Sequence, residues 1–211
     1  MKAFIIDKYG KADVVHLADM PEPVLKADDV LVEIHAASIN PLDLKIRSGE
    51  FKLLLPYRMP LTMGNDCSGV VVGVGAGVKH FKVGDEVYAR PHQDYIGTFA
   101  ERIAIQENCL ALKPKVLSME EAAAMPLVGL TAWQALVEKG QLKKGQKVLI
   151  HAGSGGVGTF AIQLAKHLGA TVATTASAAN ADMLKRLGAD IVIDYKTDDF
   201  STALKKIGRA S

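Results

Sequence analysis

The sequence predicts an α/β protein in which a β-rich N-terminal domain precedes a βαβαβ unit. Short strand patterns separated by turn signals dominate about the first 110 residues. Strand and helix patterns then alternate from residue 147 to residue 194, with a glycine-rich turn after the first strand. Such alternation is typical of a parallel sheet with crossover helices. We expect a boundary near residue 120 and two domains, 1–120 and 121–211.

The composition favours a small-molecule ligand. Of the 211 residues, 49% are hydrophobic and 23% are charged, which is enough apolar surface for a core. The net charge is only +2 and the basic residues are scattered, so no surface for nucleic acid or anionic lipid is indicated. If the protein assembles, we expect a homodimer.

Neither membrane insertion nor a disulfide framework is expected. The start, MKAFIIDKYG, has no apolar run of signal-peptide length, and the most apolar segments, 70–78 and 122–133, are interrupted by glycine or proline. The two cysteines, Cys67 and Cys109, are too few for a disulfide framework or a four-thiolate metal site. This usage favours a reducing, cytoplasmic location.

The N-terminal domain is expected to form a curled sheet. Residues 29–38 (DVLVEIHAAS) alternate apolar and polar side chains, as a strand with one buried face does. Residues 67–78 and 81–90 predict two strands around a turn near 79–82, and residues 97–105 predict another. Bulges or close backbone approaches are indicated by Gly69, Gly73, Gly75 and Gly77.

The C-terminal elements begin with a capping box. Ser118 and Glu121 predict the start of a helix, and Pro126 predicts a break or a fresh first turn. Residues 127–140 predict a helix that ends at Gly140. Strands follow at 147–151, 171–175 and 190–194, separated by helices at 159–168 and 179–187.

A glycine-rich loop follows the first strand of the βαβαβ unit. It consists of Gly153, Ser154, Gly155, Gly156, Val157 and Gly158. It matches G-x-G-x-x-G between a strand and a helix, the context of a dinucleotide-binding loop. A side chain at Gly155 would block a pyrophosphate, Gly158 permits close helix–strand packing, and the helix N-terminus stabilises phosphate charge. The alternative is a tight turn with a purely structural role.

The second strand of the unit favours NADP over NAD. NAD sites usually have an acidic residue at its end to bind the ribose 2′-hydroxyl, and this strand has none. Instead, small hydroxyl residues leave room for a 2′-phosphate: Thr174, Thr175 and Ser177. Lys185 and Arg186 on the next helix either approach that phosphate or lie on a solvated face.

Six stretches carry a resemblance to a known family. They are residues 38–49 (SINPLDLKIRSG), 64–89, 97–101 (GTFAE), 122–136, 148–158 (VLIHAGSGGVG) and 187–195 (LGADIVIDY). In order and spacing, the chain resembles the medium-chain dehydrogenase/reductase superfamily, specifically its zinc-free, zeta-crystallin-like quinone oxidoreductase branch. The resemblance implies a GroES-like domain followed by a partial Rossmann domain.

The resemblance also implies site residues around the cofactor. In relatives, the positions of Asn40, Asp43 and Thr131 lie around the nicotinamide ribose and reacting ring, although Asn40 and Asp43 are equally suited to capping a short helix. Tyr195 resembles a tyrosine beside the adenosine 2′-phosphate. Asn180 stands where many relatives have a phosphate-binding lysine, which weakens the NADPH assignment.

No zinc site is expected from the resemblance. Zinc-dependent relatives have a cysteine near Asn40, a His-Glu pair at Asn65-Asp66 and another ligand near Pro126, and this chain has none of those thiols or imidazoles.

The source of the proton is left open by the resemblance, because relatives often have a tyrosine where this chain has Phe51. Water supplies the proton in one interpretation, and Lys45 or Tyr57 donates it in another.

The resemblance implies a zinc-independent NAD(P)H-dependent oxidoreductase that transfers hydride to a quinone or an α,β-unsaturated carbonyl. Relatives continue beyond this length with the second half of the nucleotide sheet. We therefore expect the chain to be a truncated or partial form. The alternative is a non-catalytic form that binds nucleotide weakly or acts through protein contacts.

Overall fold

The computed structural model describes residues 1–198 and divides into two compact units. The first is Met1–Leu127, and the second begins at Val128. The helix α2 (Met119–Ala123) packs against three strands of the first unit, so the chain leaves that unit only after the helix. The two units therefore divide after Leu127, a few residues beyond the change of sequence pattern near residue 120.

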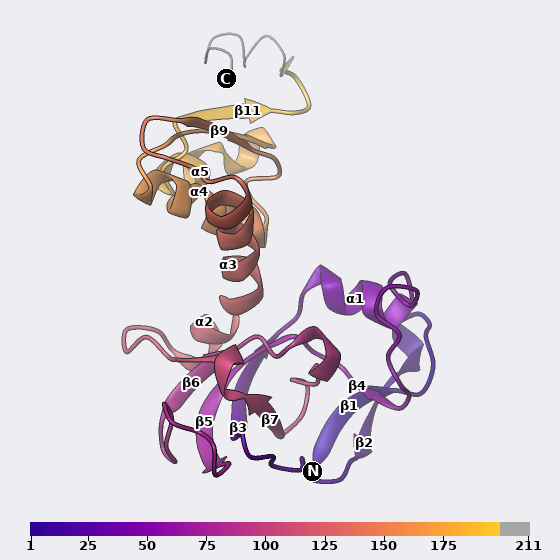
Figure 1. Cartoon of the computed structure of the whole chain (residues 1–211). Coiled ribbons are helices and arrows are strands. Elements are labelled where there is room, and N and C mark those ends of the chain that lie inside the picture. The colour runs from indigo at the N-terminus through magenta and orange to yellow at the C-terminus, as the bar shows by residue number, and fades with distance from the viewer. Residues whose placement is uncertain (199–211) are drawn as a thin grey trace. The chain divides into compact units, whose positions relative to one another are not determined.

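Two sheets form the first unit (Figure 1). The larger sheet is antiparallel in the order β7 (Arg102–Gln106), β3 (Asp29–Ser38), β5 (Asp66–Val74), β6 (Glu86–Ala89) and β8 (Leu110–Leu112). The smaller sheet has the order β2 (Val15–Asp19), β1 (Lys2–Ile6) and β4 (Leu61–Thr62). Their cores contain the inward apolar side chains of these strands, and α1 (Pro41–Ser48) adds Ile46 to the smaller core.

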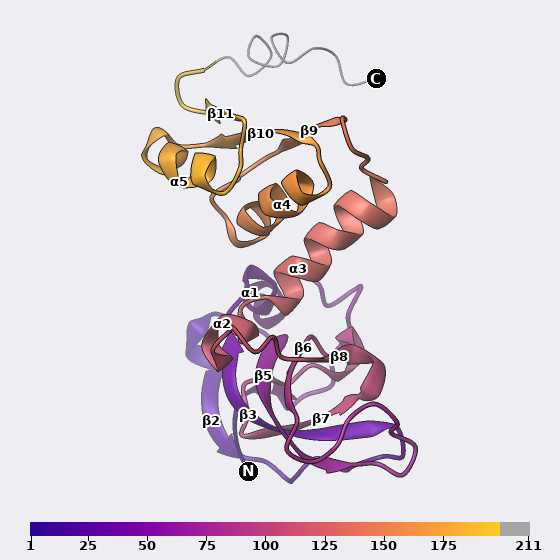
Figure 2. The same cartoon turned by 90° about the vertical axis from the view of Figure 1, so that its left-hand side faces the viewer.

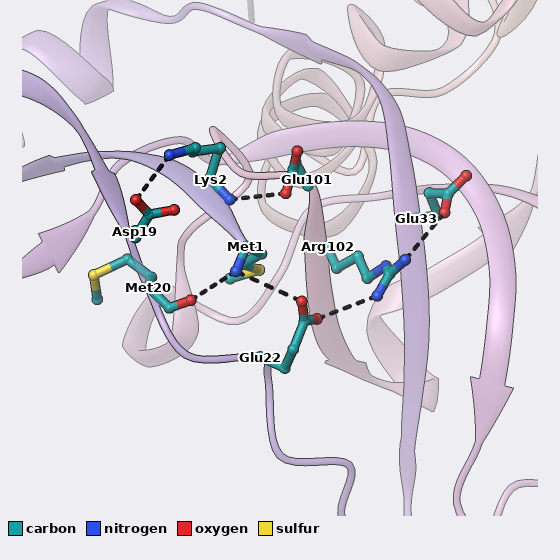
Figure 3. A network of polar contacts seen from close by, with 8 residues as sticks. All are labelled: Met1, Lys2, Asp19, Met20, Glu22, Glu33, Glu101 and Arg102. Carbon is teal, nitrogen blue, oxygen red and sulfur yellow. Dashed lines mark hydrogen bonds and ion pairs between the residues drawn. The ribbon is translucent and has the colours of Figure 1, made fainter.

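A polar network connects β7 and β3 of the larger sheet with β1 of the smaller sheet (Figure 3). Arg102 on β7 lies between Glu22 at 3.4 Å and Glu33 on β3 at 3.7 Å. On the β1 side, Glu101 accepts a hydrogen bond from the backbone N–H of Lys2 at 2.8 Å. The charged side chains of these ion pairs are exposed, so the pairs add little to stability.

Glycines sit where the backbones of the larger sheet touch. The pairing of β3 with β5 shifts register near Ile34, which lies opposite Gly69. A Cβ at Gly69 would overlap the carbonyl oxygen of Glu33, and one at Gly75 would overlap that of Lys26. The close backbone approaches expected at Gly69 and Gly75 are confirmed, and a second register shift lies beside Gly73.

The capping box expected at Ser118 is confirmed. The Ser118 hydroxyl accepts from the N–H of Glu121 at 3.2 Å, and the Glu121 carboxylate accepts from the N–H of Ser118 at 2.9 Å. Pro126 then begins a fresh helix, α3 (Pro126–Trp133), which continues as a π-helical segment, Gln134–Lys139, and ends at Gly140.

The second unit is the expected βαβαβ arrangement. Its elements are β9 (Lys147–Ile150), α4 (Gly156–His167), β10 (Thr171–Ala176), α5 (Ala181–Arg186) and β11 (Ile191–Asp194). The strands are parallel in the order β11-β10-β9, and α4 and α5 lie on one side of the sheet (Figure 2). Their core contains Ile162, Val172 and Leu184.

Short 3-10 turns complete the described chain. They are Ala12–Val14, Gln93–Tyr95, Glu107–Cys109 and Ala178–Asn180. No helix within residues 1–198 is long and apolar enough to cross a membrane.

Gly69→Ala is expected to lower the free energy of unfolding by roughly 1–3 kcal/mol, because its methyl group meets backbone that cannot yield. Gly73→Ala is the matched control on the same strand, since a Cβ there lies 3.5 Å from the Leu31 side chain. Urea unfolding of both variants makes the comparison. Equal losses for the two variants would contradict the backbone overlap at Gly69.

Candidate functional site

Three predicted binding segments meet at one edge of the parallel sheet. The glycine loop follows β9, Ser177 follows β10 and Tyr195 follows β11. The carboxyl ends of parallel strands share an edge, and the N–H of Tyr195 donates to the carbonyl of Ala176 at 3.3 Å. This edge is where open α/β sheets bind ligands.

The loop is buried at its ends and open at its centre. Gly153 and Gly158 are buried, whereas residues 154–157 are exposed. A Cβ at Gly153 would overlap the Thr174 hydroxyl, and one at Gly158 would overlap the carbonyl oxygen of Ala152. A Cβ at Gly155 would meet only the Ala152 carbonyl oxygen, at 3.4 Å.

These positions fit a dinucleotide phosphate. The outer glycines are needed by the protein's own packing, and Gly155 leaves space on the solvent side. Gly155 is also the N-cap of α4, and its N–H donates to the Ala152 carbonyl at 3.0 Å. Because the first N–H groups of a helix have no intrahelical acceptors, the first turn of α4 offers donors and positive dipole charge to an anion.

The residues expected at the 2′-phosphate lie together after β10 and β11. The Asn180 amide donates to the Ser177 hydroxyl at 3.3 Å, and Tyr195 is 63% exposed. Lys185 and Arg186 are exposed on α5. The expectation that Thr174 and Thr175 leave room for the phosphate needs correction, because both side chains are buried and bonded to backbone.

Each of these threonine hydroxyls has a structural partner. Thr174 donates to the carbonyl of Ile150 at 2.7 Å, and Thr175 accepts from the N–H of Ala152 at 3.1 Å. Sequence reasoning missed both bonds, because neither pairing follows from spacing along the chain.

Thr131 is exposed on α3. On the same helix, Val128 lies against the glycine loop, where a Cβ at Gly156 would stand 3.2 Å from it. The next residue, Gly129, packs close to the Phe160 ring of α4. α3 therefore borders the loop at the turn that precedes Thr131.

A buried polar network surrounds Asn40 in the first unit. Asn40 is the N-cap of α1, and its N–H donates to the Asp43 carboxylate at 2.6 Å. The other Asp43 oxygen accepts from the Asn65 amide at 2.7 Å. The Asn40 amide donates to the Asp66 carboxylate at 2.9 Å, as does the Ser38 hydroxyl. The predicted pair Asn40 and Asp43 therefore lies together, in the capping arrangement.

Burial dominates the electrostatics of this network. It raises the pKa of Asp66 to about 6, although hydrogen bonds from Ser38, Asn40 and the N–H of Leu127 oppose the rise. It also raises the pKa of Asp43, against the hydrogen bond from Asn65. The Asn65 side-chain oxygen is buried and lacks a hydrogen-bond partner among the described residues.

Lys45 and Tyr57 lie outside this network. The Lys45 ammonium is 3.8 Å from Glu50 and 5.7 Å from the centre of the Phe51 ring. The Tyr57 hydroxyl donates to the Gln93 carbonyl at 2.7 Å, and burial raises its pKa to about 12. Tyr57 also lines a surface cavity of about 460 Å³ with Leu54 and Arg58.

The residues at the zinc positions do not fit a zinc ion. Both Asp66 oxygens already accept hydrogen bonds from protein groups. Burial raises the pKa of Cys67 to about 12, so its thiol stays protonated within the sheet core. Within residues 1–198, no three His, Cys, Asp or Glu side chains cluster as metal ligands.

The Asp66 pKa has a consequence for stability. A carboxyl whose pKa is about 6 when folded and 3.8 in its ordinary state holds a proton more tightly in the folded protein. We expect the stability of the wild type relative to Asp66→Asn to fall as the pH rises from 4 to 7. Urea unfolding across this range measures it.

The control for this experiment is Asp85→Asn. The hydrogen bond from Lys82 lowers the pKa of Asp85. We therefore expect the stability of the wild type relative to Asp85→Asn to fall as the pH falls, opposite to the trend for Asp66. Parallel curves for the wild type and Asp66→Asn would refute the raised pKa.

Known proteins are similar to this chain in sequence and in fold. The chain is 45% identical over 209 residues to 2-methylene-furan-3-one reductase of Solanum lycopersicum, covering 95% of this chain and 53% of that protein. The quinone oxidoreductase of Coxiella burnetii matches with 41% identity and a TM-score of 0.89, covering 96% of this chain and 65% of that one.

A third relative is known with a nucleotide. The Escherichia coli quinone oxidoreductase complexed with NADPH matches with 33% identity and a TM-score of 0.86, covering 98% of this chain and 62% of that one. The chain spans about half the length of the curated relatives it matches.

The family matches follow the two halves of the chain. Residues 26–142 match the alcohol dehydrogenase GroES-like domain, and residues 156–210 match the zinc-binding dehydrogenase family. With the GroES-like sheet, the Rossmann-type βαβαβ unit and these relatives together, the chain belongs to the medium-chain dehydrogenase/reductase superfamily.

Proposed function

We propose that this chain binds NADPH through the carboxyl edge of its parallel sheet and serves a zinc-independent oxidoreductase that reduces quinones or α,β-unsaturated carbonyls. The observation that carries the proposal is the open side of Gly155, between two glycines that the protein's own packing requires. A merely structural turn has no need for a small residue at that position.

The residues at the carboxyl ends of β10 and β11 favour NADPH, which carries a 2′-phosphate, over NADH. No carboxylate follows β10 to bind a ribose 2′-hydroxyl, and Ser177, Asn180 and Tyr195 offer neutral hydrogen-bonding groups there. The Escherichia coli relative known with NADPH supports the same choice.

The residues of this chain bind and orient. The loop and the first turn of α4 hold the pyrophosphate, and residues after β10 and β11 select the adenosine end. NADPH supplies the hydride when it is bound. Asn40 and Asp43 act as a pair, because each is hydrogen-bonded to the other. Water is favoured over Tyr57 as the proton source, since the Tyr57 hydroxyl already donates its proton to the carbonyl of Gln93.

Substrate and location follow from the same reasoning. The Solanum lycopersicum relative is named as the reductase of an enone and the Coxiella burnetii relative as a quinone oxidoreductase. A reducing compartment such as the cytoplasm suits Cys67 and Cys109, which are both free thiols.

Calorimetry with NADPH, NADH and 2′-phospho-ADP-ribose tests the proposal, with quinone reduction measured separately. We expect NADPH and 2′-phospho-ADP-ribose to bind with similar affinity and NADH to bind more weakly. Stronger binding of NADH would overturn the cofactor preference. Binding without turnover would favour the non-catalytic alternative for this chain.

Gly155→Val is expected to weaken NADPH binding at least tenfold while leaving the fold intact, because its side chain fills ligand space and not protein space. Gly158→Ala is the contrasting variant, and it should lower stability because its methyl group overlaps Ala152. Cofactor fluorescence and urea unfolding separate the two effects. Unchanged NADPH affinity in Gly155→Val would remove the loop from the site.

EDTA treatment is expected to change neither stability nor nucleotide binding, because Asp66 and Cys67 are committed to protein contacts and to the core. The family description "zinc-binding dehydrogenase" makes this a sharp test. Elemental analysis showing one tightly held zinc per chain, with a loss of stability on chelation, would refute zinc independence.

A further inference from the structure

Three consecutive residues, His151, Ala152 and Gly153, lead from β9 into the glycine loop and contact one residue of the neighbouring strand. Thr175 accepts the N–H of Ala152 on its hydroxyl at 3.1 Å and the N–H of Gly153 on its carbonyl at 2.9 Å. The same hydroxyl lies 3.3 Å from Nδ1 of His151. Thr175 is itself buried, so this set of contacts is anchored in the sheet.

The residue at the centre of these contacts has an unfavourable backbone conformation. Ala152 has φ +53°, in the left-handed region that residues with a Cβ rarely adopt. Such a conformation persists only where the surroundings fix it. Here its N–H is held by Thr175, and its carbonyl accepts the N–H of Gly155.

The left-handed turn sets the direction of the loop. The Ala152 carbonyl receives the N–H of Gly155, the N-cap of α4, and it is also the group against which Gly158 packs. A change at Ala152 would therefore move both the N-cap and the first turn of the helix that faces the phosphate.

We infer that Thr175 is a positioning residue for the nucleotide phosphate: its hydroxyl fixes the left-handed Ala152 peptide and so aligns the first turn of α4 before the ligand arrives. This inference rests on the proposed nucleotide site. Thr175 does not touch the ligand in this role, and it acts through Ala152 and the loop.

Thr175→Val tests the inference, because it removes the hydroxyl and keeps the branched shape in the buried site. We expect the dissociation constants of NADPH and 2′-phospho-ADP-ribose to rise about tenfold, because the Ala152 N–H loses the hydrogen bond that aligns the loop. Thr175→Ser, which restores the hydroxyl, is expected to return them to within about twofold of the wild type.

Thr174→Val is the matched control. Thr174 is the preceding buried threonine on the same strand; it packs against Gly153, but its hydroxyl donates to the carbonyl of Ile150 and makes no hydrogen bond to the loop. We expect this variant to lose stability while its nucleotide affinity stays within about twofold of the wild type. An equal loss of affinity in Thr174→Val and Thr175→Val would overturn the inference, because it would indicate general destabilisation.

Amide hydrogen exchange of the free protein gives a readout that needs no ligand. Thr175→Val should speed the exchange of the Ala152 N–H about tenfold, and Thr174→Val should not. Unchanged exchange in Thr175→Val would refute the positioning role. If the wild type binds no nucleotide while exchange responds as expected, the proposed function fails and the positioning of the loop by Thr175 stands.

Discussion

Contact of backbone with backbone, with no side chain between, is the constraint on which both units depend. In the first unit, Gly69 lies against the carbonyl of Glu33, at the bulge where the large sheet curls. In the second, Gly158 lies against the carbonyl of Ala152, and this contact brings the start of α4 onto the end of β9. Each contact fixes the geometry of the elements beside it, because a carbonyl group within a sheet or turn has little freedom to move.

The two units use polar groups differently. Around Asn40, the first unit buries the carboxylates of Asp43 and Asp66 and satisfies each with side-chain and backbone donors. The second offers backbone N–H groups and hydroxyls at the candidate site. The first arrangement holds a helix start to a sheet, and the second leaves donors available to an anion.

Much of the architecture was predictable from the sequence, because local patterns determine it. The strand at 29–38, the capping box at Ser118 and the glycine loop each depend on residues close together in the chain. The partners of Thr174 and Thr175 were not predictable, since they lie on β9 and on the loop that follows it. The pKa of Asp66 likewise depends on burial by elements distant in sequence. The roles of Lys45 and Tyr57 remain predictions.

Three of the four glycines of the loop, Gly153, Gly155 and Gly158, differ in what keeps them small. Gly153 and Gly158 are constrained by atoms of the protein itself, so a descendant that no longer bound nucleotide would still need them in order to fold. Gly155 is constrained only by whatever occupies the solvent side of the loop. Once selection for ligand binding relaxed, mutations at position 155 would accumulate while Gly153 and Gly158 stayed fixed. The identity of residue 155 in any lineage therefore records whether the site is still in use.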